Sequence, residues 1–431
     1  MSEHHIVVVG GGAGGLELAS KLGRKYGSSR AVKVTLVDRN LTHIWKPLLH
    51  EVAAGALDAD MDGVDYRVQA AAAGFRFQPG ELTQVDRDSQ TLTLAPICDD
   101  AGHEIVAART LEYNHLVLAI GSVTNDFGTA GAAEHCYFLD SVKQAKKFHH
   151  TLMNTFLALQ AQRYPRPLRV GIVGAGATGV ELAAELHKSA ELIRSYGFDD
   201  FELTQLEIVL IEAGERILPA LSERIAAAAS RELAKLGVKI CVNTAVESVS
   251  KEGFVTRSGD FIEASIKVWA AGVRAPDFLA NFAGLETNRG NQLVVTDVLQ
   301  TTRDANVFAL GDCAAFTQAN GSRVPPRAQA AHQMADCVYE NIVRSLKGQS
   351  LKRFTYKDHG SLVSLSNYTA VGSLMGNLTR GSMMIEGMMA RFMYKSLYRM
   401  HQVALHGYFK TFLYMLAQGI NRRLRPRLKL H

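Results

Sequence analysis

The stretch IVVVGGGAGGLELASKL, residues 6–22, decides the fold of this chain. Residues 6–9 form a short apolar run with three valines and predict a buried strand. A glycine-rich loop follows, residues 16–25 predict a helix, and residues 32–37 predict a second strand that ends at Asp38. The chain therefore opens with a strand–loop–helix–strand unit of the kind that builds parallel sheets.

The glycines of this loop stand where a dinucleotide fold needs them. Gly10 allows a tight turn, Gly12 lets a pyrophosphate approach the backbone, and Gly15 lets the helix pack closely on the strand. Free N–H groups and the dipole at the N-terminus of the helix favour negative charge there. Asp38 lies 23 residues after Gly15, near the usual position of an acid that accepts hydrogen bonds from a ribose.

The same unit occurs a second time. Residues 174–186, GAGATGVELAAEL, match residues 10–22 at eight of thirteen positions. A predicted strand precedes this copy, residues 180–193 predict a helix, and residues 206–211 predict a strand that ends at Glu212. A repeat of this kind indicates two copies of one supersecondary unit and therefore two dinucleotides. Two tight turns without a ligand are the alternative.

In the second copy, Gly174, Gly176 and Gly179 fill the three glycine positions. A carboxylate at Glu212 would repel a 2′-phosphate, which favours NADH over NADPH. Arg216 is close enough in sequence to moderate this preference.

A late strand assigns the flavin to the first copy. Residues 307–310 predict a strand followed by Gly311 and Asp312, as in flavoproteins that bind two dinucleotides, where a late strand returns to the FAD unit. Asp312 would then accept hydrogen bonds from the ribityl chain of FAD. It can also act as the N-cap of a helix that begins near Cys313.

These signals predict an α/β chain with two Rossmann-like domains, the two-dinucleotide-binding flavoprotein fold, and a C-terminal α+β region that ends in membrane-surface amphipathic helices. We expect an FAD domain split between residues 1–125 and 290–350. We expect an NADH domain over residues 165–285 and a membrane-association region over residues 351–431.

Composition supports large buried cores and isolates a basic tail. The 431 residues are 47 % hydrophobic and 21 % charged, which suits two or three globular domains. The net charge is +5, but nine of the 47 Lys and Arg residues and none of the 42 Asp and Glu residues lie within residues 387–431. Such a tail on a slightly acidic body indicates an anionic partner.

The five cysteines form no C-x-x-C or zinc pattern, which fits a reducing compartment and argues against disulfide reductase chemistry. We expect no signal peptide and no membrane-spanning helix.

The tail predicts a helix that lies in a membrane surface. Apolar and basic side chains fall on roughly opposite sides over residues 389–400: Met389, Met393, Leu397 and Met400 against Arg391, Lys395 and Arg399. Further apolar residues follow, and then a basic cluster over residues 422–429. Cations that face anionic lipid beside an apolar stripe are typical of interfacial helices. An ordinary core helix with a solvated tail is the alternative, and a nucleic-acid tail lacks a recognition motif.

Taken together, these residues resemble the type II NADH:quinone oxidoreductases, the single-subunit respiratory NADH dehydrogenases that pump no protons. The resemblance covers essentially the whole chain. Its segments are residues 10–15, HIWKPLLHEVAAG at 43–55, VGAGATGVELA at 173–183, WAAGVRAP at 269–276, ALGDCA at 309–314, AQAAHQ at 328–333 and RMHQVALHGYFK at 399–410.

The resemblance implies roles for particular residues. Gln329 and Gln333 match the family's A-Q-x-x-x-Q element and would hydrogen-bond a quinone from one helix face. Lys46 matches a segment that passes near the flavin ring. Glu181 matches an acid between flavin and nicotinamide that handles protons or charge. Glu17 holds the equivalent place in the first copy, so a simple helix-dipole role for Glu181 stays open.

The full expectation for the sites is as follows. The FAD residues are Gly10, Gly12, Ala13, Gly14, Gly15, Asp38, Arg39, Lys46, Val85, Ala119, Gly121, Asp312, Ala328 and Gln329. The NADH residues are Gly174, Gly176, Thr178, Gly179, Glu212 and Gly272. Gln329 and Gln333 would bind quinone, Glu181 would be catalytic, and no metal is expected.

The expected reaction is hydride transfer from NADH to FAD, followed by transfer of two electrons to a membrane quinone such as ubiquinone. The expected place is the cytoplasmic face of the cell membrane, in the respiratory electron-transport chain. The alternatives are a soluble flavin reductase of the ferredoxin or rubredoxin type, a sulfide:quinone reductase with flavin-proximal cysteines, and a non-enzymatic NADH-sensing flavoprotein. A homodimer through the C-terminal third stays open.

Overall fold

The computed structural model describes residues 3–161, 167–196, 203–365, 369–375, 382–424 and 428. The chain forms two compact units, each built from three separate segments. The first unit comprises Met1–Trp45, Gly63–Val123 and Val273–Lys357. The second comprises Lys46–Asp62, Thr124–Gly272 and Asp358–His431.

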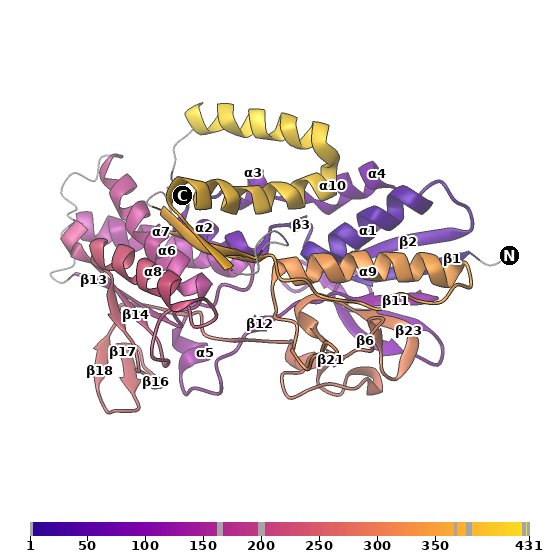
Figure 1. Cartoon of the computed structure of the whole chain (residues 1–431), viewed down its shortest axis with the longest axis horizontal. Helices are drawn as coiled ribbons and strands as arrows, with labels where there is room; N and C mark the ends of the chain where they lie inside the picture. The colour runs from indigo at the N-terminus through magenta and orange to yellow at the C-terminus, as the bar shows by residue number, and fades with distance from the viewer. Residues whose placement is uncertain are drawn as a thin grey trace. The chain divides into compact units, whose positions relative to one another are not determined.

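The first unit is built on a six-stranded sheet with the order β22-β23-β11-β1-β2-β5 (Figure 1). Its strands are β1 (His4–Val9), β2 (Val32–Asp38), β5 (Arg76–Pro79), β11 (His115–Leu118), β22 (Gln300–Thr301) and β23 (Asp304–Ala309). All neighbours pair in parallel except β22 with β23. Ile6, Val7 and Val8 have no exposed surface, as expected for a central strand with both faces covered.

Helices α1 (Ala13–Tyr26) and α9 (Ala328–Leu346) lie side by side in this unit (Figure 1). Helix α4 (Tyr66–Ala73) also contacts α1. A small antiparallel sheet of β6 (Leu82–Asp86), β7 (Thr91–Leu94) and β10 (Arg109–Glu112) is inserted between β5 and β11 in the chain. The helix α9 that carries the two predicted quinone residues is therefore packed on the helix that follows the first glycine loop.

The second unit repeats the plan with four parallel strands in the order β15-β14-β13-β19. They are β13 (Leu168–Val173), β14 (Leu206–Ile211), β15 (Lys239–Cys241) and β19 (Ile266–Trp269). Helix α7 (Ala177–Arg194) follows the second glycine loop, and α8 (Glu223–Lys235) connects β14 to β15. An antiparallel sheet of β16 (Val246–Val249), β17 (Gly253–Thr256) and β18 (Phe261–Glu263) is inserted before β19, which mirrors the insertion in the first unit.

The C-terminal segment packs within the second unit. Strands β25 (Gly360–Leu365), β26 (Thr369–Met375) and β27 (Ser382–Glu386) form an antiparallel sheet, and α10 (Gly387–Leu424) contacts all three of them. Helix α10 is broken at Gly407, whose φ of 76° and ψ of 171° are not helical. Figure 1 shows the two halves of α10, in yellow, running back along each other from this break.

The structure confirms the α/β fold with two Rossmann-like sheets. The division of the chain differs from the expected domain boundaries, because Lys46–Asp62 and Asp358–His431 join the second unit. The sequence of these two segments does not indicate which unit they join, because that depends on the residues they pack against in the folded chain. The assignment of a separate membrane-association region to residues 351–431 remains a prediction.

Candidate functional site

The first glycine loop is closed by contacts to both neighbouring strands. Gly10 donates its N–H to Val37 O at 2.8 Å, and its φ is +104°. A Cβ at Gly10 would lie 2.3 Å from Ala119 O, so another residue would not fit. The N–H of Gly11 donates to Asp38 Oδ2 at 2.6 Å. The structure thus brings together Gly10, Asp38 and Ala119, three residues predicted for the FAD site.

The N-terminus of α1 is available to a ligand. Gly12 is the N-cap, and no side chain caps the helix. A Cβ at Gly12 would meet no atom within 4 Å, whereas one at Gly15 would lie 1.9 Å from Gly10 O. The loop is therefore crowded on its protein side and open at Gly12, while Ala13 in the first turn is half-buried and Gly14 is buried. Open backbone N–H groups at a helix N-terminus suit a pyrophosphate.

Asp312, the residue after the late strand that was predicted to contact FAD, lies beside Ser122. Ser122 Oγ donates to Asp312 Oδ2 at 2.7 Å, and the neighbouring Gly121 has a φ of +78°. Asp312 sits inside the short 3-10 helix Gly311–Cys313, whose N-cap is Leu310 and which has no side-chain cap. The alternative interpretation of Asp312 as an N-cap is therefore wrong, because the helical turn begins two residues earlier than that interpretation assumed.

The first turn of α9 lies against the same loop. A Cβ at Gly14 would lie 2.8 Å from Ala331 O, so Ala328 and Gln329 begin the helix next to the glycine loop. Gln333 points elsewhere: its Nε2 donates to Lys357 O at 2.8 Å, and its Oε1 accepts from Lys357 N at 2.9 Å. Its amide therefore fastens the chain before β25, a contact between distant segments that the sequence did not indicate.

Three predicted flavin residues have other neighbours. Arg39 follows Asp38 and faces Glu81, with 3.4 Å between Nη1 and Oε1. Val85 is a buried residue of β6 that pairs with Leu92. Lys46 belongs to the second unit, where its Nζ lies 3.6 Å from Oδ1 of Asp140. Their contacts to FAD remain predictions.

Tyr66, the first residue of α4, contacts the first glycine loop, and the sequence did not predict this contact. Its hydroxyl donates to Gly11 O at 2.7 Å, and a Cβ at Gly11 would lie 2.4 Å from the ring. Burial, together with the charge of Asp38, raises the pKa of Tyr66 well above its usual value. Tyr66 stands 55 residues after Gly11, so no local motif could have found it.

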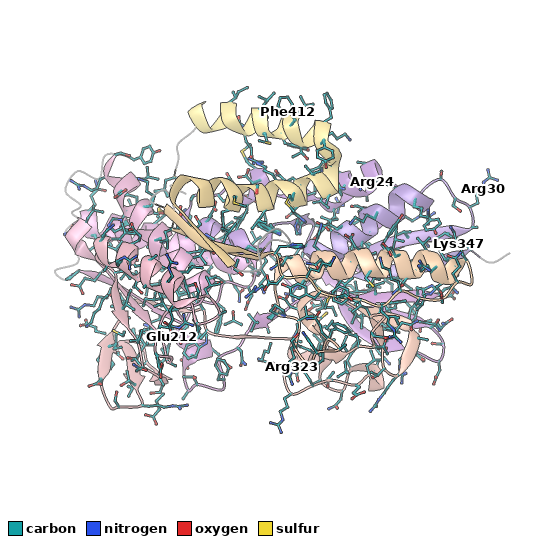
Figure 2. The ribbon with its side chains drawn as sticks, in the orientation of Figure 1. Arg24, Arg30, Glu212, Arg323, Lys347 and Phe412 are labelled. Atoms are coloured by element: carbon teal, nitrogen blue, oxygen red, sulfur yellow. The ribbon has the colours of Figure 1, made fainter. Side chains whose placement is uncertain are left out.

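The second loop repeats the geometry of the first. Gly174 donates to Ile211 O at 2.8 Å, and the N–H of Ala175 donates to Glu212 Oε2 at 2.8 Å. The other oxygen of Glu212 accepts from the N–H of Gly214 at 2.8 Å. Glu212 is thereby held at the end of β14 (Figure 2), in the position that Asp38 holds in the first unit.

The start of α7 is equally open. Gly176 is the N-cap, without a side-chain cap, and a Cβ there would meet no atom within 4 Å. A Cβ at Gly179 would lie 2.0 Å from Gly174 O, which is the close packing expected of the third glycine. Thr178 is exposed in the first turn.

The side chain of Arg216 is directed away from a role at the ribose. Its Nη1 donates to Leu221 O at 2.8 Å and its Nη2 to Pro219 O at 3.2 Å. These two carbonyl groups hold the guanidinium within its own loop. The guanidinium of Arg216 therefore does not offset the charge of Glu212, and the preference for NADH over NADPH remains a prediction.

Glu181 is buried in a cluster of ionisable groups within the second unit. Its Oε2 lies 3.6 Å from Nδ1 of His50, and its Oε1 accepts from the N–H of Ser364 at 3.0 Å. Burial, reinforced by the charge of Glu51, raises the pKa of Glu181 to about 8. Burial lowers the pKa of His50 to about 4. At neutral pH this pair therefore holds one proton, on the carboxyl group.

Tyr394 of α10 completes this cluster. Burial and the carboxyl groups of Glu181 and Glu51 raise the pKa of Tyr394 well above its usual value. His50 lies in α2 (Leu49–Ala54), so α2, α7, β25 and α10 all contribute. The motif search named only Glu181, because the other members come from segments far apart in the sequence.

The C-terminal helix exposes its apolar residues mainly after the break at Gly407. The exposed apolar side chains of this half are Tyr408, Phe409, Phe412, Leu413, Tyr414, Met415, Leu416 and Ile420. Figure 2 labels Phe412 on this segment. Among the described residues, no helix is both long and apolar enough to cross a bilayer.

Arg399 corrects one expectation for this helix. We expected it to face lipid, but its Nη1 donates to Gln402 Oε1 at 2.5 Å and its Nη2 to Gln418 Oε1 at 2.8 Å. Gln418 in turn donates to Asp62 Oδ1 at 2.7 Å. The break at Gly407 folds the second half of α10 back, so Arg399 lies between the halves. The side chains of Arg391, Lys395, Arg422 and Arg423, and all of Arg425, Arg427 and Lys429, lie outside the described residues.

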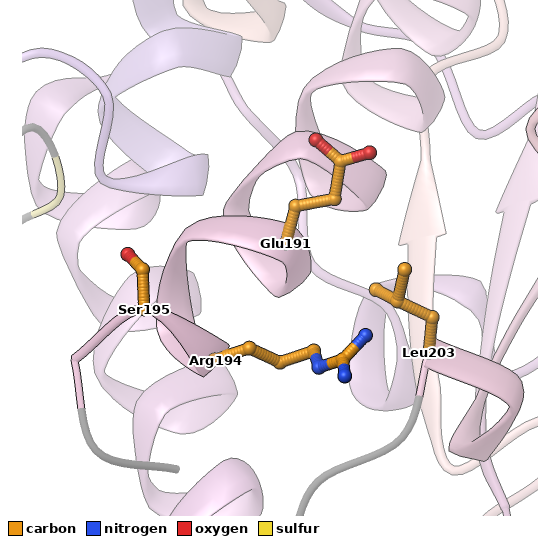
Figure 3. Close-up of a pocket in the computed structure, with 4 residues that line it drawn as sticks. All are labelled: Glu191, Arg194, Ser195 and Leu203. Carbon is orange, nitrogen blue, oxygen red and sulfur yellow. The ribbon is translucent and has the colours of Figure 1, made fainter. Parts of the chain in front are cut away.

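A further pocket lies at the C-terminal end of α7. It is lined by Glu191, Arg194 and Ser195 from the end of the helix and by Leu203 from the turn before β14 (Figure 3). None of these residues belongs to the predicted sites.

Comparison with known proteins agrees with this geometry. A family model described as pyridine nucleotide-disulphide oxidoreductase matches residues 4–335. The type II NADH:quinone oxidoreductase of Haemophilus influenzae is 47 % identical over 442 residues, which cover 99 % of this chain and all of that protein. The protein of the same name from Staphylococcus aureus is 31 % identical over 387 residues, which cover 87 % of this chain and 91 % of that protein.

Solved structures share the fold. NDH2 from Plasmodium falciparum in complex with NADH matches with a TM-score of 0.83 at 19 % identity, over 99 % of this chain and all of that chain. The sulfide:quinone oxidoreductase from Aquifex aeolicus matches with a TM-score of 0.72 at 17 % identity, over 98 % of this chain and 96 % of that chain. Because the match to the Haemophilus protein spans nearly the whole of both chains, this chain belongs to the type II NADH:quinone oxidoreductases.

Proposed function

We propose that this chain uses bound FAD to pass two electrons from NADH to a membrane quinone. The observation that carries this proposal is the repeated loop in which a strand-end carboxylate accepts from the glycine loop: Gly11 to Asp38 in one unit and Ala175 to Glu212 in the other. Two such loops serve two dinucleotides. The name of the Haemophilus relative, 47 % identical, supplies the donor and the acceptor.

The first unit fits FAD. Its helix N-terminus has no side-chain cap, a Cβ at Gly12 or Gly121 would meet no atom, and Asp38 and Asp312 supply carboxylates for hydroxyl groups. FAD, when bound, supplies the two-electron chemistry. The residues of this unit bind its phosphates through backbone N–H groups and orient its ribose and ribityl chain.

The second unit binds NADH in this proposal. Gly176 and the open first turn of α7 receive the pyrophosphate, and Glu212 accepts from the ribose of the adenosine half. NADPH is disfavoured because Glu212 repels a 2′-phosphate and Arg216 is bonded to carbonyl groups of its own loop.

Gln329 and Glu181 serve the acceptor side. Gln329, in the first turn of α9, donates a hydrogen bond from its amide to a quinone carbonyl. Gln333 contributes by holding Lys357, and one of its N–H groups remains for the quinone. Glu181 stores the proton that its environment retains at neutral pH and exchanges it during turnover.

The second half of α10 attaches the enzyme to the membrane surface. Its exposed apolar side chains enter the headgroup region, and the basic sequence that follows residue 421 adds an attraction to anionic lipid. The proposed place is the cytoplasmic face of the cell membrane, as a peripheral protein. A soluble ferredoxin-type reductase has no need for such a surface. A homodimer through this region remains a prediction.

Two matched glycine variants test the division of labour. A methyl group at Gly12 or Gly176 would meet no protein atom, and their φ values of −64° and −71° suit any residue. We expect Gly12→Ala to lose FAD, measured by the flavin spectrum. We expect Gly176→Ala to keep FAD and raise the KM for NADH by about tenfold or more, because its methyl group meets the pyrophosphate.

The activity assay uses the purified full chain with a short-chain ubiquinone as acceptor. We expect rapid NADH oxidation that requires quinone, much slower oxidation of NADPH, and none of sulfide. Turnover that prefers NADPH or needs no quinone would refute the proposal. A flavoprotein that binds NADH but turns over negligibly would favour the sensing alternative.

A further inference from the structure

The loops after β11 and β19 are equivalent in the two units. Each runs along the first glycine of its copy: a Cβ at Gly10 would lie 2.3 Å from Ala119 O, and one at Gly174 would lie 2.6 Å from Cα of Ala271. In each loop a glycine, Gly121 or Gly272, stands at the same distance in sequence from the end of the preceding strand. Both loops therefore border the place where a dinucleotide crosses its glycine loop.

The two loops differ at the glycine that ends them. Gly121 and Gly272 both have positive φ values, +78° and +67°. A Cβ at Gly121 would meet no atom within 4 Å, whereas one at Gly272 would lie 2.5 Å from Cζ of Phe127. The second unit thus carries an aromatic ring over a backbone position that is open in the first unit.

Phe127 is held in an unfavourable state. Its φ of +55° lies in the left-handed region, which bulky residues rarely adopt, and its side chain is 67 % exposed. Two hydrogen bonds hold the loop: Asn125 Oδ1 accepts from Phe127 N at 2.9 Å, and Asn125 O accepts from Trp269 Nε1 at 3.0 Å. Strained residues of this kind are enriched at active sites and ligand-binding sites.

The order of the strands decides which half of a dinucleotide passes Phe127. β14, which ends at Glu212, and β19, which leads to Gly272, lie on opposite sides of β13 and its glycine loop. A pyrophosphate on the loop therefore sends one half of the dinucleotide toward Glu212 and the other toward Gly272. If the ribose of the adenosine half is at Glu212, the nicotinamide half is at Gly272.

We propose that the ring of Phe127 is part of the NADH site and packs against the nicotinamide half of the dinucleotide. The inference rests on the proposed function, in which NADH is the donor. Aromatic rings stabilise flat heterocycles and sugar faces by burying apolar area and by stacking. Binding would cover the exposed part of the ring and so offset the unfavourable state of the free protein.

The test is a calorimetric titration of the FAD-loaded full chain with NAD⁺. It measures binding directly and needs no turnover. We expect Phe127→Ala and Phe127→Gly to raise the Kd for NAD⁺ about three- to tenfold and to raise the KM for NADH similarly. Phe127→Tyr, which keeps the ring, should stay near the wild-type value. The KM for quinone should not change in any of them.

Phe261 provides the matched control. It is an exposed phenylalanine of β18 in the same unit, 53 % exposed, and Phe261→Ala should leave the Kd for NAD⁺ unchanged. Phe127→Gly distinguishes a role of the ring in binding NADH from a role in supporting the loop backbone. Glycine accepts a positive φ, so this variant should not lower the unfolding temperature. An unchanged Kd in Phe127→Ala and Phe127→Gly overturns the inference and leaves the ring as a support for Gly272. A wild-type protein that binds NAD⁺ but does not reduce quinone refutes the proposed function and not this inference.

Discussion

The two glycine-loop helices carry a glutamate at the same position, two residues after the third glycine, and the histidine beside each glutamate has its pKa shifted in the opposite direction. Glu17 of α1 is buried and forms an ion pair with His332 of α9. This contact raises the pKa of His332 and so favours the ion pair. Glu181 of α7 lies near His50, but burial raises the pKa of Glu181 to about 8 and lowers that of His50 to about 4, so the second pair is neutral.

The difference shows that surroundings, and not the repeat, set the chemistry. The side chain of His332 is 35 % exposed to water, and the charge of Asp336 raises its pKa by more than the charge of Lys21 lowers it. The side chain of His50 is 3 % exposed, and Glu51 adds negative charge beside Glu181. A charge without solvation is costly, and the second pair avoids it by keeping the proton on the carboxyl group.

The largest expected effect follows from removing that proton site. Glu181→Gln should lower kcat with quinone by about a hundredfold, because proton transfer by a positioned group commonly contributes that much or more. The wild-type kcat should fall as the pH rises through about 8, and this decline should be absent in the variant. Steady-state assays between pH 6 and pH 9.5, at about half-unit steps, measure both effects. A variant with wild-type kcat would mean that Glu181 only complements the helix dipole.

The equivalent change in the first helix should act on stability. Glu17→Gln removes the partner of His332 and should cost about 2 kcal/mol of unfolding free energy, reduced from a fully buried pair because His332 is partly exposed. Since the pKa of His332 is raised, this contribution is complete below pH 6.5 and disappears as the pH rises through the folded-state pKa. Urea unfolding at acidic and alkaline pH measures it. A constant deficit at all pH values would contradict the ion pair, and Glu17→Gln with His332→Gln serves as the control.

The two ribose carboxylates offer a smaller effect. Glu212→Ala should raise the KM for NADH about tenfold and reduce the discrimination against NADPH, because a charge-assisted hydrogen bond and a repulsion are both lost. FAD content should not change, since Asp38 serves the first loop. Parallel assays with both nucleotides provide the measurement. An unaltered NADH to NADPH ratio would assign the preference to other residues.

The smallest expected effect is a pH dependence of stability. Glu181 has a folded-state pKa of about 8, above its unfolded value, so its favourable contribution is complete below about pH 4.5 and is lost as the pH rises through 8. Glu181→Gln has no such loss. Its unfolding free energy relative to wild type should therefore improve by on the order of 1 kcal/mol between pH 5.5 and pH 6.5. A difference that stays constant, or grows in the wild-type protein's favour, would show that Glu181 is ionised in the folded state.

Sequence reasoning located both glycine loops and the strands around them closely. The strand predicted at residues 206–211 is β14 (Leu206–Ile211), and the helix predicted at 180–193 is α7 (Ala177–Arg194). Such elements are local, because a strand's apolar run and a helix's periodicity are properties of consecutive residues. The break of α10 at Gly407 was missed, since an isolated glycine inside a helical pattern can be tolerated without ending the helix.

The sequence by itself determined that this chain has two dinucleotide loops with their acids, because the glycines and strand ends that make them are neighbours along the chain. Only the tertiary structure decided the proton on Glu181, the clamp of Gln333 on Lys357 and the ring of Phe127 over Gly272. Each depends on a partner from a distant segment. Burial and close contact, which set pKa values and occupied hydrogen bonds, exist only once those segments have been brought together.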